Sequence, residues 1–152
     1  MSISKKVAAV GVAAALVSVA GVTQASATEY RGSACDGLFP CISMYFNSNQ
    51  QGSHSSFAGY GKINFEGYSF ASASNGQGQP VKNNAASAYF RAKTSDESAV
   101  IYFYSNQAGP CDWLWAQGDK FSIANRLNKT YNENASLKLV DGSLSVGECY
   151  QF

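Results

Sequence analysis

The chain has 152 residues, of which 45% are hydrophobic and 14% are charged. Lys and Arg total 11 against 10 Asp and Glu, so the formal net charge is +1, and the charges form no run of one sign. Nucleic acids and anionic membranes select proteins with a basic stripe or patch, and we expect neither as a partner.

The N-terminus has the three parts of a secretory signal peptide. Lys5 and Lys6 form a positive start, residues 7–22 form an apolar run rich in Ala and Val, and Ala25-Ser26-Ala27 provides the small residues of a cleavage site. A membrane anchor is the alternative, but it needs about 20 residues that are usually more apolar than this run. We therefore predict a signal peptide over residues 1–27, a single secreted domain over residues 28–152, and a secreted, extracellular location.

All four cysteines, Cys35, Cys41, Cys111 and Cys149, lie beyond the predicted cleavage site. An even number of cysteines in an exported chain predicts disulfides rather than free thiols. A zinc site is less favoured, because five residues separate the first two cysteines and the chain has a single histidine. Four cysteines allow three pairings. We favour Cys35–Cys41 and Cys111–Cys149, because the first two lie close together in the sequence.

Short β-branched and aromatic segments follow along the chain, separated by clusters of Gly, Asn and Ser. Residues 42–46, 87–90 and 100–104 have the composition of strands, and the polar segment Ala71 to Gln79 is predicted to be an exposed loop. Residues 137–146, with Asp141-Gly142 at their centre, have the pattern of a β-hairpin. Many short strands with frequent turns predict an all-β sandwich or barrel.

An internal repeat divides this region into two similar halves. Residues 45–52 (YFNSNQQG) return 57 positions later as residues 102–109 (YFYSNQAG), with six of eight positions identical. A second pair of segments, residues 83–87 and 132–136, follows in the same order. We infer a duplication into two similar β units. In each, Tyr45 or Tyr102 is expected to fold over the next turn, and Gly52 or Gly109 to adopt a positive φ there.

These residues resemble the Greek-key motif of the βγ-crystallins, in which an aromatic residue, a second side chain, a glycine and a later serine recur. The matching positions are Tyr45, Gln50, Gly52 and Ser87, then Tyr102, Gln107, Gly109 and Ser136. Gln50 and Gln107 stand where the family has a second aromatic residue. The segment from Cys35 to Asn49 is similar to the start of small secreted bacterial βγ-crystallin-like peptidase inhibitors of the metalloproteinase-inhibitor type. The resemblance covers residues 35–140.

The resemblance implies a single βγ-crystallin-like domain of two Greek-key motifs forming a β-sandwich. It also implies a secreted protein-binding domain that inhibits a peptidase, with an extracellular protease as partner. We expect a monomer and no enzyme, with no catalytic residues. His54 among Ser53, Ser55 and Ser56 fits a solvated strand face, and Asp96-Glu97 fits a solvated turn. The alternatives are a calcium-stabilised structural or cell-envelope-associated module, or an antimicrobial or killer-type protein on the same scaffold.

The first candidate for a protein-binding loop is the segment from Gly109 to Trp115. A disulfide at Cys111 would stiffen it, and stiffness lowers the cost of ordering a loop on binding, while Trp is enriched at binding hot spots. The candidate contact residues are Pro110, Asp112, Trp113 and Trp115. The favoured alternative is that the two tryptophans, two positions apart on a strand, fill the core. The loop from Ala71 to Gln79 is the next candidate.

The resemblance also implies a calcium site built from two short polar runs. The matching positions are Asn83, Asn84 and Ser87 in the first half and Asn132, Glu133 and Ser136 in the second. The final serine of the family's motif is replaced by Ala88 and Leu137. Calcium binds best to several carboxylate oxygens, and only Glu133 supplies one, so any binding would be weak. We favour polar turns whose side chains bond their own backbone, and expect no cofactor.

Overall fold

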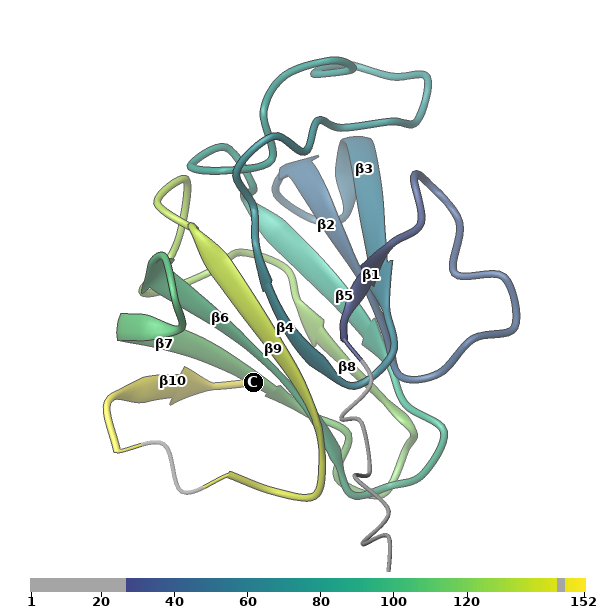
Figure 1. The fold of residues 1–152 in the computed structure, drawn as a ribbon, viewed down its shortest axis with the longest axis vertical. Helices are drawn as coiled ribbons and strands as arrows, with labels where there is room; N and C mark the ends of the chain where they lie inside the picture. Colours follow the sequence, from purple (N-terminus) through teal and green to yellow (C-terminus); the bar gives the residue numbers. More distant parts are fainter. Residues whose placement is uncertain (1–26, 145–146) are drawn as a thin grey trace, which may run out of the picture.

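The structure, a computed structural model, describes residues 27–144 and 147–152, so nearly all of the predicted signal peptide lies outside the described residues. The described part is all-β (Figure 1), and no helix in it is long and apolar enough to cross a membrane. Its strands are β1 (Glu29–Tyr30), β2 (Cys41–Asn47), β3 (Gln51–Ala58), β4 (Gly61–Asn64), β5 (Ser87–Arg91), β6 (Glu97–Tyr104), β7 (Ala108–Trp115), β8 (Phe121–Ala124), β9 (Ser136–Asp141) and β10 (Cys149–Gln151).

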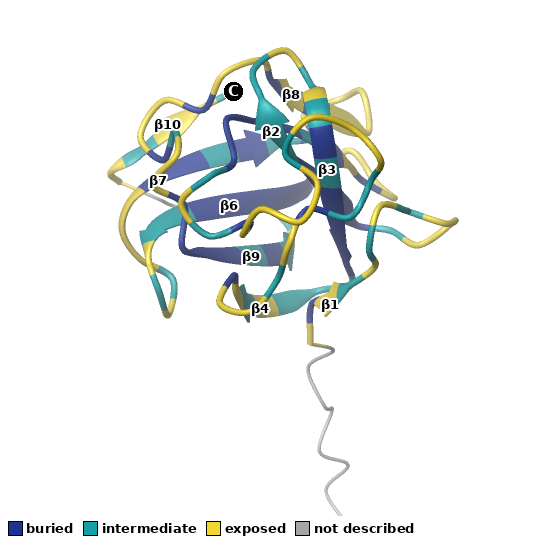
Figure 2. Cartoon of the chain, turned by 90° about the horizontal axis from the view of Figure 1, so that it is seen from above, coloured by how far each residue is buried: buried dark blue, intermediate teal, exposed yellow. Residues whose placement is uncertain are grey.

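The strands form two five-stranded sheets that pack face to face, which confirms the predicted β-sandwich. Sheet A has the order β1-β3-β2-β5-β8 and sheet B the order β10-β7-β6-β9-β4. Neighbouring strands are antiparallel except β10, which is parallel to β7. The three predicted strands are confirmed as β2, β5 and β6. Figure 2 shows that the buried residues gather on the strands where the two sheets face each other.

The two halves of the sequence are interleaved. The first half places β2, β3 and β5 in sheet A but β4 in sheet B, whereas the second half places β6, β7 and β9 in sheet B but β8 in sheet A. Each half therefore completes the other's sheet with one strand. This equivalent placement supports the inferred duplication, and the Greek-key description remains a prediction.

The repeated segments form equivalent turns. A register shift interrupts the β2–β3 pairing between Tyr45 and Asn47, and another interrupts the β6–β7 pairing between Tyr102 and Tyr104. The backbone is left-handed at matching positions in the two copies: Asn49 (φ 58°), Gln50 (54°) and Gly52 (77°), then Asn106 (63°), Gln107 (59°) and Gly109 (79°). The predicted positive φ at both glycines is confirmed.

The side chain that covers each turn differs from the prediction. A Cβ added to Gly109 would lie 2.4 Å from Cδ2 of Tyr104, and one added to Gly52 would lie 3.0 Å from Nδ2 of Asn47. The covering residue therefore comes two positions after the predicted Tyr102 or Tyr45. The register shift explains the change, because a bulge re-aims the side chains that follow it.

A buried serine pins each turn in the same way. The Ser87 hydroxyl donates to the carbonyl oxygen of Asn47 (2.6 Å) and accepts from the amide of Gln50 (3.0 Å). The Ser136 hydroxyl donates to the carbonyl oxygen of Tyr104 (2.7 Å) and accepts from the amide of Gln107 (2.9 Å).

Two glutamines at matching positions of the repeat, Gln50 and Gln107, link the halves. The Gln50 amide group donates to the carbonyl oxygen of Ala124 in β8 (2.9 Å), and that of Gln107 donates to the carbonyl oxygen of Ile63 in β4 (3.3 Å). Each glutamine thus binds the strand that the other half contributes to its sheet.

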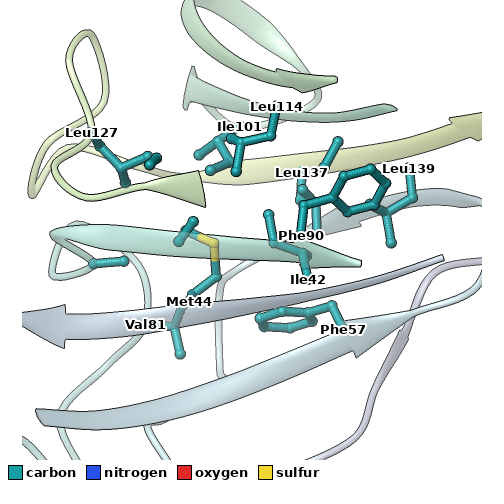
Figure 3. Close-up of a cluster of buried hydrophobic side chains, with 14 of the residues drawn as sticks. Ile42, Met44, Phe57, Val81, Phe90, Ile101, Leu114, Leu127, Leu137 and Leu139 are labelled. Carbon is teal, nitrogen blue, oxygen red and sulfur yellow. The ribbon is translucent and has the colours of Figure 1, made fainter. Parts of the chain in front are cut away.

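The hydrophobic core lies between the sheets (Figure 3). It is built from fully buried aromatic and aliphatic side chains of both sheets, including Ile42, Met44, Phe57, Phe90, Ile101, Leu114, Leu137 and Leu139. Buried and less buried positions alternate from Asp112 to Trp115 in β7 and from Leu137 to Val140 in β9, as in a sheet with one face inside. Cys41 to Met44 of β2 and Glu97 to Ile101 of β6 are buried at every position.

The predicted hairpin over residues 137–146 is wrong. β9 pairs with β6 on one side and β4 on the other, so neither of its edges is free for a following strand. After Gly142 the chain leads to β10, at the opposite edge of sheet B (Figure 1). Residues 145–146 lie outside the described residues.

Candidate functional site

Both predicted disulfides are present. Cys35 pairs with Cys41 and Cys111 with Cys149, with Cα–Cα distances of 5.9 and 4.4 Å. The first closes the segment that leads into β2. The second joins β7 to the C-terminal strand β10, whose first residue lies opposite Cys111 in the register.

The segment from Gly109 to Trp115 is not a loop, which corrects the first candidate for a binding site. It lies within β7, between β10 and β6. Pro110 is exposed near the start of the strand, but Cys111 to Trp115 pair with β6, and Cys111 to Trp113 also pair with β10 on the other side. The segment is therefore held rigid by the neighbouring strands, and a partner could contact it only on the flat outer face of the sheet.

The tryptophans lie on the outer face of sheet B, so the prediction that they fill the core is wrong. Leu114, between them, points into the core, and Trp113 and Trp115 point the opposite way because side chains alternate along a strand. Their rings stack with centroids 5.4 Å apart and an interplanar angle of 10°, and both are half-buried. The two-residue spacing correctly predicted that both tryptophans lie on the same face of the strand, but it did not determine whether that face points into the core.

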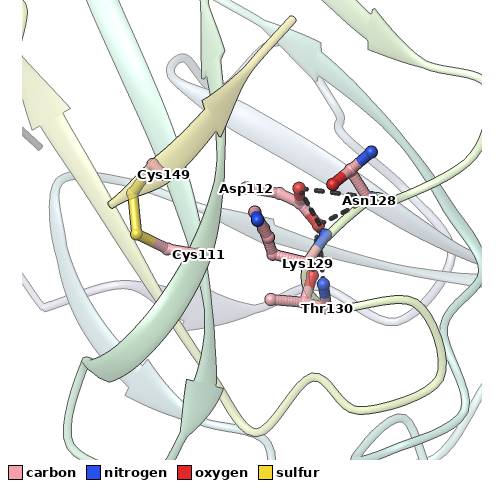
Figure 4. Close-up of a disulfide and its surroundings, with 6 residues drawn as sticks. All are labelled: Cys111, Asp112, Asn128, Lys129, Thr130 and Cys149. Carbon is pink, nitrogen blue, oxygen red and sulfur yellow. Dashed lines mark hydrogen bonds between the residues drawn. A yellow bond between two sulfur atoms is a disulfide. The ribbon is translucent and has the colours of Figure 1, made fainter. Parts of the chain in front are cut away.

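Asp112 is fully buried and has a structural role (Figure 4). Its carboxylate accepts hydrogen bonds from the backbone amides of Asn128 (3.1 Å), Lys129 (3.0 Å) and Thr130 (2.9 Å), and from the Thr130 hydroxyl (2.7 Å). A buried carboxylate needs such donors to offset its lost hydration. Asp112 therefore fastens the segment after β8 to β7 and is not free to bind a partner.

The two predicted calcium runs lie side by side. The amide of Asn83 donates to the carbonyl oxygen of Asn134 (2.8 Å), and the amide of Asn132 donates to that of Ala85 (3.0 Å). The side chain of Asn84 donates to a nearby backbone carbonyl oxygen. Ser87 and Ser136 use their hydroxyls in the two turns described above, so these contacts fit the structural alternative. The expectation of no cofactor, with weak calcium binding as the alternative, stays a prediction.

A protruding loop, residues 71–80, is the best candidate for a docking site. It lies beyond the end of β2 and β3, at the top of Figure 1. Its exposed residues are Ala73, Ser74, Asn75, Gln77, Gly78, Gln79 and Pro80. From Tyr68 to Val81 the chain contains no charged residue. The prediction of an exposed loop from Ala71 to Gln79 is confirmed.

The base of this loop is fastened to β3. The amides of Ala71 and Ser72 both donate to the carbonyl oxygen of His54 (3.1 Å each), and the amide of Ser53 donates to that of Asn75 (2.7 Å). The Ser72 hydroxyl accepts from the His54 amide (2.7 Å) and lies 2.9 Å from Nδ1 of the imidazole. The other ring nitrogen, Nε2, lies 2.9 Å from the carbonyl oxygen of Ser33. A carbonyl only accepts, so Nε2 carries the proton and Nδ1 accepts from Ser72.

The outer part of the loop is braced as well. The amide of Phe70 donates to the carbonyl oxygen of Gln79, and the amide of Gly78 donates to the carbonyl oxygen of Phe70 (2.9 Å each). The ring of Phe46 lies against Gly76, where an added Cβ would be 2.2 Å from Cγ of the ring. Gly76 also has φ +91°, a conformation that side-chain-bearing residues rarely adopt. The loop is thus held along its length without a disulfide.

The polar segment of residues 53–56 and the charged residue Glu97 are both more buried than the sequence predicted. Ser53, Ser55 and Ser56 are buried and His54 is half-buried, so the expected solvated strand face is wrong. Glu97 is also fully buried, accepting from the Tyr60 hydroxyl and the Lys93 amide, which corrects the expected solvated turn. Burial, with Glu97 as hydrogen-bond partner, raises the pKa of Tyr60 well above its ordinary value.

No protein-family model, curated protein or solved structure matches this chain. The resemblance to βγ-crystallin-like inhibitors therefore stays a prediction, and the case for function depends on the loop's own geometry.

Proposed function

We propose that the chain is a secreted, non-enzymatic protein-binding domain that inhibits an extracellular peptidase through the loop of residues 71–80. The observation that supports this proposal is the combination of exposure and bracing in one loop. Seven of its residues are exposed, while backbone bonds from Phe70, His54 and Ser53 hold its ends and its middle.

Bracing favours inhibition over hydrolysis. A loop that is ordered before binding loses little conformational entropy when it enters a cleft. If a peptide bond in it were cut, the hydrogen bonds on both sides would hold the two new ends in place. The two disulfides and the sandwich give the loop a stable support, and disulfides are typical of exported proteins.

The composition of the loop narrows the class of target. Trypsin-like peptidases bind a cationic side chain through a buried Asp, and the loop offers neither Lys nor Arg. Its small and uncharged side chains fit peptidases with narrow or neutral subsites. We therefore expect a metallopeptidase, or a serine peptidase with a small or neutral specificity pocket, as the target.

An inhibition screen tests the proposal. The purified protein is incubated with metallo- and serine peptidases, and Ala73→Arg and Ser74→Arg are compared with the parent against each enzyme inhibited. Both side chains are exposed, so the added bulk should block docking without unfolding the domain. Ser95→Arg is the matched control, because Ser95 is exposed in the β5–β6 connection at the other end of the molecule (Figure 1).

We expect the two loop variants to lose at least thirtyfold in inhibition, about 2 kcal/mol of binding, which is typical of a hot spot. The control should inhibit like the parent, and all three should keep the parent's melting temperature. Inhibition that survives both loop substitutions would move the contact surface elsewhere. Full peptidase activity throughout the screen would overturn the proposed function.

A further inference from the structure

An open cavity of about 720 Å³ lies against sheet B at its β4 side. It is lined by residues 60–62, by residues 138–141 and by Ala27, the last residue of the predicted signal peptide, so the cleaved domain keeps all of this lining except Ala27. The volume is within the range of small-molecule sites, about 300–1,000 Å³. Most of the lining surface is apolar, and the lining includes Tyr60 and Val140. The Tyr60 hydroxyl is already bonded to the buried Glu97.

Two lysines stand directly opposite each other beside this apolar surface. Lys62 in β4 and Lys138 in β9 are register partners in the antiparallel pair. Both point to the outer face, because their neighbours Ile63, Leu137 and Leu139 pack in or against the core. Like charges in this position repel and destabilise a sheet. Within residues 27–144 and 147–152 the ion pairs are Arg31–Glu29 and Lys82–Glu66, so neither lysine has an acidic partner there.

The other half of the molecule shows that the scaffold does not require this lysine pair. Ser87 corresponds to Ser136 in the duplication, so Lys138 corresponds to Tyr89. The register partner of Tyr89 is Ile123 in β8. The equivalent site in sheet A thus holds an aromatic and an aliphatic residue, whereas sheet B holds two cations at a repulsive position next to an apolar cavity.

The unpaired lysines and the apolar cavity beside them together suit a ligand with a negatively charged head and an apolar chain. We propose that the cavity binds an amphiphilic carboxylate of the fatty-acid type. Its head would lie between Lys62 and Lys138, where it would neutralise their repulsion, and its chain would lie over Val140 and the Tyr60 ring. Asp141 also lines the cavity, but it is three residues beyond Lys138, about 10 Å along the strand, so the carboxylate would lie nearer to the two lysines than to Asp141.

Titration of the purified protein with decanoate, monitored by NMR, tests this proposal. Decan-1-ol supplies the same chain without the charge, and acetate supplies the charge without the chain. The variants are Lys62→Gln and Lys138→Gln, with Lys129→Gln as the control at an exposed position outside the cavity. Ala73→Arg, in the loop of residues 71–80, is included because it should abolish inhibition without affecting decanoate binding, so the two proposals can fail independently.

We expect saturable decanoate binding with shifts at residues 60–62 and 138–141, weaker binding of decan-1-ol, and none of acetate. Each lysine variant should weaken decanoate binding about tenfold, which is 1.4 kcal/mol, while Lys129→Gln and Ala73→Arg leave it unchanged. Without ligand, each lysine variant should melt about 1–3 °C higher, because a repulsion has been removed. Absence of saturable binding, equal binding of decan-1-ol, or lysine variants that bind like the parent would overturn the proposal.

Discussion

The two buried turn serines give a prediction in which one half of the molecule serves as the control for the other. Ser87 and Ser136 are fully buried, and each hydroxyl makes one bond to a carbonyl oxygen and one to an amide. Replacing either serine with alanine leaves that carbonyl and that amide without a partner and creates almost no cavity. Because the contacts match to within 0.1 Å in the two turns, the two substitutions should cost the same.

The loss of unfolding free energy can be estimated from the carbonyl and the amide that each substitution leaves without a hydrogen-bond partner. A buried donor or acceptor that loses its partner costs about 1–3 kcal/mol, and the second lone pair of the carbonyl and slight local relaxation reduce the sum. We expect about 2 kcal/mol for Ser87→Ala and the same for Ser136→Ala. The double variant should lose about 4 kcal/mol, since the two sites share no hydrogen-bond partner and distant substitutions are nearly additive.

Urea unfolding followed by circular dichroism measures these losses, with Ser74→Ala in the exposed loop as the control. That control should stay within about 0.5 kcal/mol of the parent. A loss near 2 kcal/mol for one serine and below 0.5 kcal/mol for the other would refute the equivalence of the two turns. Small losses for both would show that the serines do not pin the turns.

Three further predictions follow from the buried groups and the polar runs. Asp112→Ala should lower the free energy of unfolding by about 3 kcal/mol, because four donors lose a charged acceptor; a loss no larger than that of the exposed Asp119→Ala would contradict this. Burial raises the pKa of Tyr45, Tyr60 and Tyr102 above the ordinary 10.0. The stability that these buried, neutral tyrosines contribute should therefore be complete below pH 10 and decline as the pH rises through their folded pKa values. Absorbance of the native protein at 295 nm measures tyrosine ionisation, and ionisation of every tyrosine near pH 10 would refute the raised pKa values. Millimolar calcium should raise the melting temperature by less than about 2 °C, whereas a micromolar site would add about 4 kcal/mol of stability; a large rise that a chelator reverses would favour the calcium-binding alternative.

The features that the sequence predicted correctly depend on local chemistry. β-branched and aromatic runs marked β2, β5 and β6, and the repeated glycine marked the left-handed turns. The small separation of Cys35 and Cys41 favoured the observed pairing. The polar composition of residues 71–79 predicted exposure. Each of these features is determined by residues that lie close together in the sequence.

The features that the sequence did not predict depend on distant partners. The exchange of β4 and β8 between the halves follows from packing of the two sheets, which no local pattern encodes. The Asp-Gly pair after β9 suited a hairpin, but β4 and β6 already occupied both edges of that strand. Asp112 looked like a surface charge because its donors, the amides of residues 128–130, are recruited by the fold.

The candidate docking site was present in the sequence only as a second choice. Cysteine and tryptophan drew attention to β7, since both are typical of rigid binding loops. The bracing of residues 71–80 instead comes from the carbonyl oxygen of His54 and the amide of Ser53 in β3, and from the Phe46 ring. Backbone hydrogen bonds leave little trace in composition, so the loop's rigidity became apparent only from the contacts.

Hydrogen–deuterium exchange of the protein, alone and with a catalytically inactive variant of a peptidase that it inhibits, locates the surface that contacts the peptidase. Exposed amides of residues 73–79 should exchange more slowly in the complex, while those of β7 and β10 should be unchanged. Protection on the face that carries Trp113 and Trp115, with residues 73–79 unchanged, would contradict this prediction.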